Sequence, residues 1–275
     1  MRPLIVIFTF LSTACNSGDD SNSNPPTGPV NEGIVRFSDD FEGPFNLDPS
    51  NLAINVWYES LRGQSTASVI SDIPARSGEK CLEMTLIANE NNLSRSEIGV
   101  NLRNSLGDYW YGLSVFIPTE YDISQMVLDQ DNFVTVLAQW GVWENNPGLP
   151  DFALRLGRDN GQNKFYLTYE PSTSLNFLWE APLIQGEWVD WIFHIKWTKD
   201  ETGVFKVWQN RNLVFSKTNF QSTDGDGDEV KSKIGLYYSN WGDRQRGFDE
   251  IKVFYDNFTV AKGEDMFDAV DPSLR

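Results

Sequence analysis

Short runs of alternating apolar and polar residues recur along the chain and constrain its fold more than any other feature. Two clear examples are WVDWIFHIKW at residues 188–197 and KFYLTYE at residues 164–170. Gly, Pro, Asn and Asp separate such runs, and no stretch keeps a helical period. Because residues two apart share a face of a strand, the pattern predicts an all-β protein, an antiparallel sandwich or barrel.

The N-terminal stretch MRPLIVIFTFLSTAC, residues 1–15, predicts an export signal. Its apolar part is much shorter than the roughly 20 residues that cross a bilayer. Ser-Thr-Ala-Cys resembles a bacterial lipobox, so we expect Cys15 to carry a lipid; ordinary signal cleavage nearby is the alternative. Residues 16–33 are rich in Pro, Gly, Ser and Asn and predict a flexible linker. The folded domain is expected at residues 34–275, exported and either secreted or lipid-anchored at the outer membrane.

The chain is strongly acidic, with a formal net charge of −17, which argues against a nucleic-acid partner. Screening acts over about 8 Å at physiological salt, so a local basic site can still operate inside an acidic surface. Once Cys15 is lipidated or removed, Cys81 is the one remaining cysteine and no internal disulfide can form. We expect a monomer that meets a membrane only through its lipid anchor.

Both ends of the predicted domain carry similar acidic segments, FSDDFEG at residues 37–43 and FYDNFTV at residues 254–260. The first and last strands of a sandwich often pair. Such pairing would bring together oxygen ligands suited to a structural calcium ion. The alternative is solvated turn carboxylates. The ligand candidates are Asp39, Asp40, Glu42 and Asp256.

Strand alternation separates packing residues from presented ones in three later segments. In NFVTVLAQWGVW, residues 132–143, the even positions are apolar and predict the core face, which leaves Gln139 on the other. In SKIGLYYSN, residues 232–240, Tyr238 is expected to pack and Tyr237 to be presented with Lys233. In LSRSEIGV, residues 93–100, Arg95 shares a face with Glu97. The even positions of the first segment are Val134, Val136, Ala138, Trp140 and Val142.

These three segments, in this order, resemble the motifs of jelly-roll polysaccharide lyases. Alginate lyases of that fold carry Arg-Ser-Glu-Leu-Arg, Gln-Ile-His and Lys-Ala-Gly-Val-Tyr-Asn-Gln. The resemblance implies a jelly-roll sandwich with a concave substrate cleft, in which Arg95 and Gln139 neutralise a substrate carboxylate and Tyr237 is catalytic. Gly141 stands where alginate lyases have the histidine of Gln-Ile-His. A mechanism that needs a histidine base at that position is therefore in doubt.

A lyase of this kind removes the C5 proton of a uronic acid and expels the O4 substituent. Arg and Gln side chains suit this β-elimination because they stabilise the charge that develops on the carboxylate, and a phenol near a cation can carry the proton. We expect Glu97 to hold Arg95 in place. No cofactor is required. Further candidates for substrate contact are Trp143, Arg155, His194, Lys196, Lys233 and Trp241.

The resemblance leads us to expect an anionic, uronic-acid-containing algal polysaccharide as the substrate, with ulvan first and glucuronan or alginate as alternatives. A glycoside hydrolase and a non-catalytic carbohydrate-binding module are the rival functions. Hydrolases of sandwich folds usually carry Glu-x-Asp-x-x-Glu on one strand, which pairs two carboxylates about 5 to 5.5 Å apart for retention of configuration. No predicted strand carries that spacing.

Overall fold

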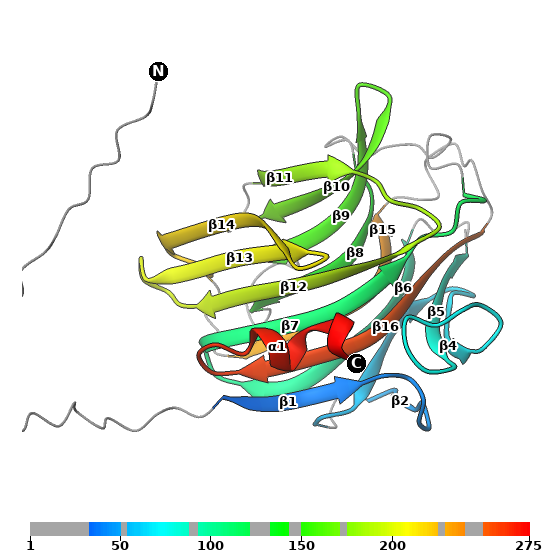
Figure 1. Ribbon diagram of the computed structural model, residues 1–275, viewed down its shortest axis with the longest axis horizontal. Coiled ribbons are helices and arrows are strands. Elements are labelled where there is room, and N and C mark those ends of the chain that lie inside the picture. Colours follow the sequence, from blue (N-terminus) through cyan, green and yellow to red (C-terminus); the bar gives the residue numbers. More distant parts are fainter. Residues whose placement is uncertain are drawn as a thin grey trace, which may run out of the picture. The chain divides into compact units, whose positions relative to one another are not determined.

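The alternating runs form the strands of a two-layered sandwich in the computed structural model of the protein (Figure 1). The structure describes residues 33–50, 54–87, 93–121, 133–142, 150–170, 175–224, 229–239 and 250–275. Within these residues the strands make two sheets of eight strands each, here named sheet A and sheet B. The prediction of an all-β sandwich is confirmed.

Sheet A has the order β14-β13-β12-β7-β16-β5-β4, and β1 also pairs with β16. Its pairings are antiparallel throughout. Asp39 lies opposite Phe258, so the expected pairing of the first and last strands is confirmed. The bounds are β1 Ile34–Asp39, β4 Thr66–Ile70, β5 Cys81–Ile87, β7 Gly107–Phe116, β12 Trp188–Trp197, β13 Gly203–Gln209, β14 Asn212–Phe220 and β16 Glu250–Lys262.

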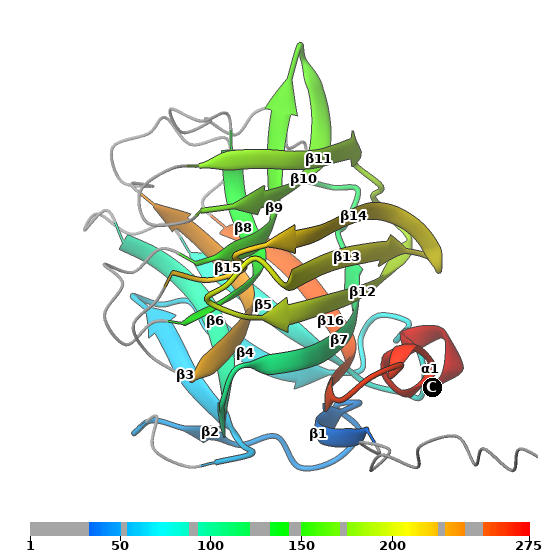
Figure 2. The ribbon, with the colours of Figure 1, turned by 90° about the vertical axis from the view of Figure 1, so that its left-hand side faces the viewer.

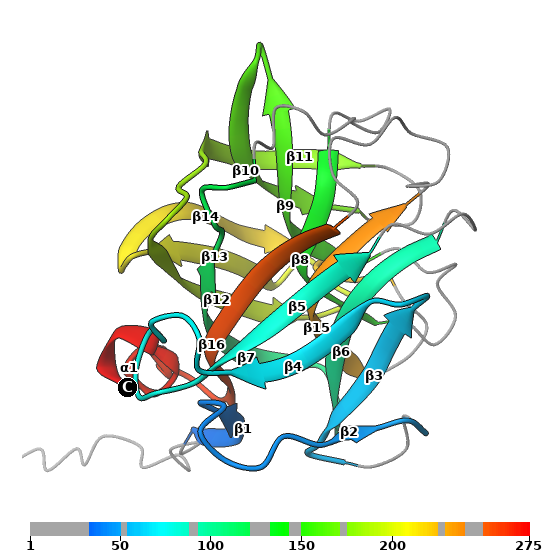
Figure 3. The same cartoon turned by 90° about the vertical axis from the view of Figure 1, so that its right-hand side faces the viewer.

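Sheet B has the order β11-β10-β9-β8-β15-β6-β3-β2, and its pairings are antiparallel except for β2 with β3. Figure 3 shows β3, β6 and β15 side by side. The bounds are β2 Leu47–Asp48, β3 Trp57–Arg62, β6 Leu93–Asn104, β8 Phe133–Val142, β9 Phe152–Asp159, β10 Gln162–Tyr169, β11 Asn176–Pro182 and β15 Val230–Ser239.

The core lies between the two sheets and is rich in aromatic side chains. Trp140 of β8 packs on Phe193 of β12 with ring centroids 4.3 Å apart. Strand alternation explains the contact, because Trp191, Phe193 and Ile195 point inward while the residues between them point outward. Each sheet therefore presents one face to the core and one face away from it. Figure 2 shows β14, β13, β12 and β7 of sheet A in this order.

The chain ends with a short helix α1, Phe267–Val270, and a 3₁₀ helix, Pro272–Leu274, on the outer face of sheet A. There Val270 belongs to a small cluster with Trp110 and Ile192. The carbonyl of Val270 lies 1.7 Å from where a Cβ at Gly112 would be, so a glycine is needed for this close approach. Among the described residues, no helix is long and apolar enough to cross a membrane.

Candidate active site

Four central strands of sheet B, β3, β6, β15 and β8, bring the predicted catalytic residues onto one face. Arg95 of β6 lies directly opposite Tyr237 of β15. Lys233 of β15 pairs with Gln139 of β8 on its other side. The intervening residues Ile234 and Leu236 are in the core, so these side chains point away from it. We call this surface the site face of sheet B. The side chain of Tyr238 lies outside the described residues.

Glu97 is the common partner of Arg95 and Gln139. Its side chain is 1% exposed, and its Oε2 lies 3.2 Å from Nε of Arg95. The side-chain amide of Gln139 donates a hydrogen bond to Oε1 of the same carboxylate. A buried charge is tolerated when it is paired and hydrogen-bonded, so Glu97 orients both neighbours while they compensate its charge.

Tyr237 lies under the guanidinium group of Arg95, whose Cζ is 4.3 Å from the ring centroid. This is cation–π geometry, and it keeps a positive charge beside the phenol. The Thr135 hydroxyl donates to the backbone carbonyl of Tyr237 at 3.0 Å and ties β15 to β8. The ring of Tyr237 is partly exposed, as a group that meets a substrate requires.

The site face carries an excess of positive charge. Burial lowers the pKa of Lys233, and the nearby charges of Arg95, Lys231 and Arg62 act in the same direction, whereas Glu97 opposes them. Arg95 and Lys233 also reach the same hydroxyl, that of Ser60, at 3.5 and 3.4 Å. Four cations and one carboxylate thus interact within this cluster, although the whole chain has a formal net charge of −17.

Tyr58 of β3 belongs to the site, and the sequence interpretation missed it. It pairs with Gly99 of β6, and its ring crosses that glycine, where an added Cβ would lie 2.3 Å from the Tyr58 ring and 2.4 Å from its hydroxyl. Burial and the charge of Glu97 raise the pKa of Tyr58 well above the ordinary value, so the phenol stays protonated. The available signal was the alternation of Tyr58, Ser60 and Arg62 in WYESLR.

Paired bulges in β8 and β15 shape the centre of the site. Ile234 pairs with Ala138 and Tyr237 with Val136, so one residue of β8 faces two of β15. Opposite β9 the extra residue is in β8, because Val136 pairs with Arg155 and Ala138 with Leu154. Leu137 therefore joins the core, whereas Val136, although buried, shares the site face with its partners Tyr237 and Arg155. The prediction that Val136 lies on the core face is therefore wrong, because the bulge reverses the alternation. Ala138, Trp140 and Val142 are core residues as predicted, and the side chain of Val134 lies outside the described residues.

A tyrosine of sheet A fixes both bulges from the core side. The Tyr255 hydroxyl lies 2.8 Å from the carbonyl oxygen of Leu137 and 3.2 Å from that of Gly235. Tyr255 is fully buried, and burial raises its pKa well above the ordinary value. Gly235 adopts a φ of 127°, a conformation that suits glycine. The backbone that carries Tyr237 is thus held from both layers.

Arg155 is engaged by its own neighbours. It forms an ion pair with Glu170, the residue after β10, and its Nε donates to the Thr168 hydroxyl of β10 at 3.1 Å. Its side chain is 13% exposed. Arg155 pairs with Val136 in the ladder, so it shares the site face but is held two strands away from Tyr237.

His194 and Lys196 do not share the site face, which corrects the expectation that they line the same cleft. Both lie on β12 of sheet A and point outward there. Nε2 of His194 is 2.8 Å from Oδ1 of Asp108, and its ring stacks on Trp110 with centroids 4.0 Å apart. Alternation along the strand correctly predicts that these side chains point away from the core. It does not predict the sheet to which the strand belongs.

Each of the four carboxylates expected to bind calcium accepts hydrogen bonds from its own donors, and Asp40 accepts from the backbone N–H of Glu42 at 3.2 Å. Oδ2 of Asp39 accepts from the Trp57 indole at 2.7 Å, and Glu42 accepts from the backbone of Glu79 and Lys80. Asp256 accepts from the backbone of residues 76, 77 and 257, while burial raises its pKa to about 6. In the described ranges, no group of three or more His, Cys, Asp or Glu side chains could hold a metal. The described residues therefore contain no ligand cluster for the expected calcium site.

Three further candidates lie outside the described residues: Trp143, Trp241 and the expected lipidation site Cys15.

Comparisons with known proteins bear on this site. The sequence profile of the family described as polysaccharide lyase matches residues 51–259. A search of curated proteins found no match. An endo-β-1,4-glucuronan lyase from the fungus Trichoderma reesei superimposes with a TM-score of 0.62 at 22% identity, covering 79% of this chain and 94% of that one.

Two other solved structures also align with this chain. The globular domain of T. cruzi calreticulin aligns with a TM-score of 0.52 at 8% identity over 86% of this chain and 90% of its own. An alginate lyase from Aplysia kurodai gives a TM-score of 0.49 at 11% identity, covering 82% and 98%. The calreticulin alignment shows that the fold alone does not decide the function, and the family profile, which spans more than half of the sequence, is the decisive match. The chain belongs to the polysaccharide lyase family, and it is an enzyme that acts on a polysaccharide.

Proposed function

We propose that the protein cleaves a uronic-acid-containing polysaccharide by β-elimination at the site face of sheet B. The observation that carries the proposal is the joint arrangement of Arg95, Gln139 and Tyr237 around the buried carboxylate of Glu97. Fixed donors aimed at one place are what stabilisation of a developing anion requires.

The reaction demands three things of the site. A base takes the proton from C5 of the uronate, and the electron pair left on C5 forms the C4=C5 double bond. The bond from C4 to the glycosidic oxygen breaks, and that oxygen receives a proton. Negative charge builds up on the carboxylate while C5 loses its proton. Arg95 and Gln139 supply donors for that charge, and their shared partner Glu97 holds them in position.

Tyr237 is proposed as the proton-transfer group, because its phenol is partly exposed and lies beside the Arg95 cation. A positioned proton-transfer group contributes about 10²- to 10⁴-fold to a rate. Tyr58 has the opposite character. Tyr58 is 4% exposed, so only the tip of its side chain can meet the substrate, and its protonated hydroxyl is suited to donate a hydrogen bond to the substrate carboxylate rather than to accept the C5 proton. Tyr237 would thus transfer the proton, and Tyr58 would hydrogen-bond the substrate carboxylate.

Ulvan is the proposed first substrate, since it carries sulfate groups as well as uronates. Arg95 is already paired with Glu97, so Lys231, Lys233 and Arg62 give the face more positive charge than one carboxylate needs. Glucuronan is the alternative with carboxylates alone. Alginate ranks last, because Gly141 lacks the side chain that the alginate lyase motif has there.

We also propose that the enzyme is exported and anchored through a lipid on Cys15, on the sequence of residues 1–15 alone. Expressing the full-length chain in a Gram-negative host and separating membranes from soluble protein tests this. Cys15→Ser should move the enzyme from the membrane fraction to the soluble fraction. An unchanged distribution would contradict lipid attachment at this residue.

A polymer panel tests the proposed reaction. The protein is incubated with ulvan, glucuronan, alginate and a neutral β-glucan, while the ultraviolet absorbance of the unsaturated product and the number of reducing ends are both followed. Elimination raises both signals on a uronate polymer, with ulvan fastest. New reducing ends without absorbance would show hydrolysis, and no change on any polymer would show that β-elimination of these substrates is not its function.

A further inference from the structure

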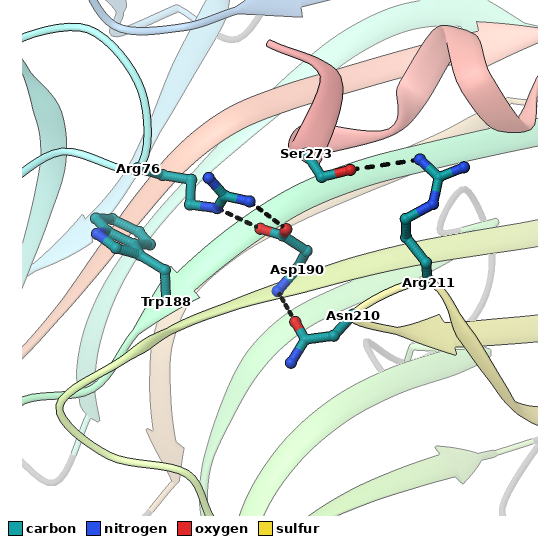
Figure 4. Close-up of a pocket in the computed structure, with 6 residues that line it drawn as sticks. All are labelled: Arg76, Trp188, Asp190, Asn210, Arg211 and Ser273. Atoms are coloured by element: carbon teal, nitrogen blue, oxygen red, sulfur yellow. Dashed lines mark hydrogen bonds and ion pairs between the residues drawn. The ribbon is translucent and has the colours of Figure 1, made fainter.

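A pocket of about 470 Å³ lies on the outer face of sheet A, and the proposed reaction makes no use of it (Figure 4). Its size falls in the range of about 300 to 1,000 Å³ that is common for small-molecule sites. Trp188 and Asp190 come from the start of β12, where Val189 between them points into the core. The pocket therefore opens on the opposite side of the sandwich from the site face. Its lining residues are Arg76, Trp188, Asp190, Asn210, Arg211 and Ser273.

Arg76 is held rigidly at the centre of this pocket. Its Nε and Nη2 donate to the two carboxylate oxygens of Asp190 at 3.0 and 2.8 Å. Asp190 also accepts from the Ser114 hydroxyl at 2.7 Å, and its backbone N–H donates to the Asn210 side chain at 2.9 Å. A guanidinium group fixed along one edge presents its remaining N–H groups in a set direction. The Arg76 side chain is 30% exposed, so those groups can reach a ligand.

Arg211 is a second fixed guanidinium group on the other side of Asp190 (Figure 4). It lies in the tight turn between β13 and β14, where Asn210 and Arg211 have φ of 47° and 64°. Its Nη1 donates to the fully buried carboxylate of Asp271 and lies 3.4 Å from the Ser273 hydroxyl. Nearly half of the side chain remains exposed.

Trp188 forms an aromatic wall of the pocket. Its indole N–H donates to the Pro74 carbonyl at 3.0 Å, and its ring packs on Phe116 with centroids 5.5 Å apart. These contacts fix the orientation of the indole while leaving the side chain partly exposed. An aromatic wall beside planar polar groups is suited to a ring that has an apolar face and hydroxyls at its edge.

The charge balance decides between a sugar and a compact anion. The two guanidinium groups interact with three carboxylates, those of Asp190, Asp271 and, at 3.6 Å, Asp268. The pocket thus lacks the net positive charge that would hold a phosphate or sulfate ion. Hydroxyl groups of a sugar ring need donors and acceptors rather than net charge, and the pocket offers both.

We propose that this pocket is a second, non-catalytic carbohydrate site that binds one sugar residue of the polysaccharide, with the ring face stacked on Trp188, the hydroxyls hydrogen-bonded to Arg76 and Arg211, and the charged group of that residue turned to solvent. It rests on a polysaccharide being the substrate, and not on the roles proposed for Tyr237, Arg95 and Gln139. Two sites on opposite faces would engage a long polymer together, whereas a short oligosaccharide would occupy one site at a time.

Affinity electrophoresis of the full-length protein in gels that contain ulvan, glucuronan or alginate tests the proposal. Trp188→Ala removes the wall, and Arg211→Lys keeps a charge for Asp271 but removes the planar fork. Each should weaken retardation by the polymer about tenfold in apparent Kd, the scale of one good aromatic or hydrogen-bonding contact. Leu213→Ala, at a 54% exposed position on β14, is the matched control and should migrate like the wild type.

The two proposals fail separately. Retardation of the wild type but not of Trp188→Ala would support the second site. If no polymer then yields unsaturated product, β-elimination is contradicted while the second site stands. Retardation of both variants equal to the wild type in every gel would overturn the second site, as would a wild type that no polymer retards. Should Trp188→Ala not fold, Arg211→Lys decides alone. Cleavage of a tetrasaccharide of the preferred polymer should be unchanged in both variants, and an equal loss there would instead indicate damage to the site face.

Discussion

Among single residues, one buried carboxylate with two partners organises the site. Glu97 is a positioning residue: it meets Arg95 and Gln139 from two strands and is itself hidden from solvent. Arg95 then lies over Tyr237 on the third strand. Positioning within hydrogen-bond distance is what converts three ordinary side chains into a site.

The hydroxyl of Tyr58 provides a prediction at this scale. Tyr58→Phe keeps the ring over Gly99 and removes only the proposed donor to the substrate carboxylate. Hydrogen bonds to charged groups contribute about 1.5 to 3 kcal/mol, so kcat/KM should fall about 10- to 100-fold. The control is Tyr109→Phe on β7 of sheet A. It removes a buried hydroxyl that donates to the backbone carbonyl of Ser105. Equal activity of both variants would contradict a substrate contact by Tyr58.

The sequence was a good guide to residues with a strong strand period. Alternation correctly puts Arg95 and Glu97, Gln139, and Tyr237 on the non-core face of their own strands, and the resemblance to polysaccharide lyases puts them in one cleft, as the pairing of β6, β15 and β8 does in the structure. It was a poor guide to which strands share a sheet. His194 therefore appeared as a site candidate although β12 belongs to sheet A, and Tyr58 was missed although it lies two strands from Tyr237.

At the scale of elements, the bulges of β8 and β15 are what the sequence pattern could not reveal. A bulge adds one residue to one strand and reverses the alternation beyond it. Val136 and Leu137 exchange their predicted faces for this reason. The site depends on the irregularity, since the Tyr255 hydroxyl is shared by the carbonyls of Leu137 and Gly235 just before Tyr237.

Gly235→Ala tests the bulge in β15. At φ of 127° an added Cβ would lie 2.1 Å from the carbonyl oxygen of Ser96 and 2.7 Å from Cα of Glu97. Strain of this kind costs about 1 to 3 kcal/mol or more, so chemical denaturation should show a clear loss of stability together with a loss of activity. Gly43→Ala is the control, because nothing lies within 4 Å of its added Cβ. Wild-type stability of the first variant would contradict the described backbone.

At the scale of the whole molecule, a buried acid couples stability to pH. Burial raises the pKa of Asp151 to about 7, although Val142 N–H and the Thr223 hydroxyl each donate to its carboxylate at 3.0 Å. The folded state therefore holds a proton that the unfolded state releases near pH 4. Its contribution to stability is greatest below about pH 4 and is lost as pH rises to about 7, by about 1.4 kcal/mol per unit.

Asp151→Asn removes this titration while keeping an acceptor oxygen. The free energy of unfolding of the variant, relative to the wild type, should rise between about pH 4 and 7 and then level off. Urea denaturation at several pH values measures the difference. A difference that is independent of pH would show that Asp151 is not protonated in the folded state.

The acidic surface and the basic site face predict an unusual salt dependence. At about 0.01 M salt, where screening acts over about 30 Å, the formal net charge of −17 repels an anionic polymer from a distance. At about 0.15 M the long-range repulsion is screened, while contacts within a few ångströms persist. The kcat/KM should therefore rise over this interval and fall again near 1 M salt. A steady fall from the lowest salt concentration would contradict this balance of charges.

Proton transfer by Tyr237 is tested most directly by the rate at which the Tyr237→Phe variant forms unsaturated product from the uronate polymer that the wild type cleaves fastest. If Tyr237 transfers the proton, kcat falls by at least about 10²-fold, the scale of a proton-transfer group, with an unchanged unfolding transition and little change in KM. A variant that keeps wild-type kcat would contradict proton transfer by Tyr237, and with it the reaction proposed for the site face of sheet B.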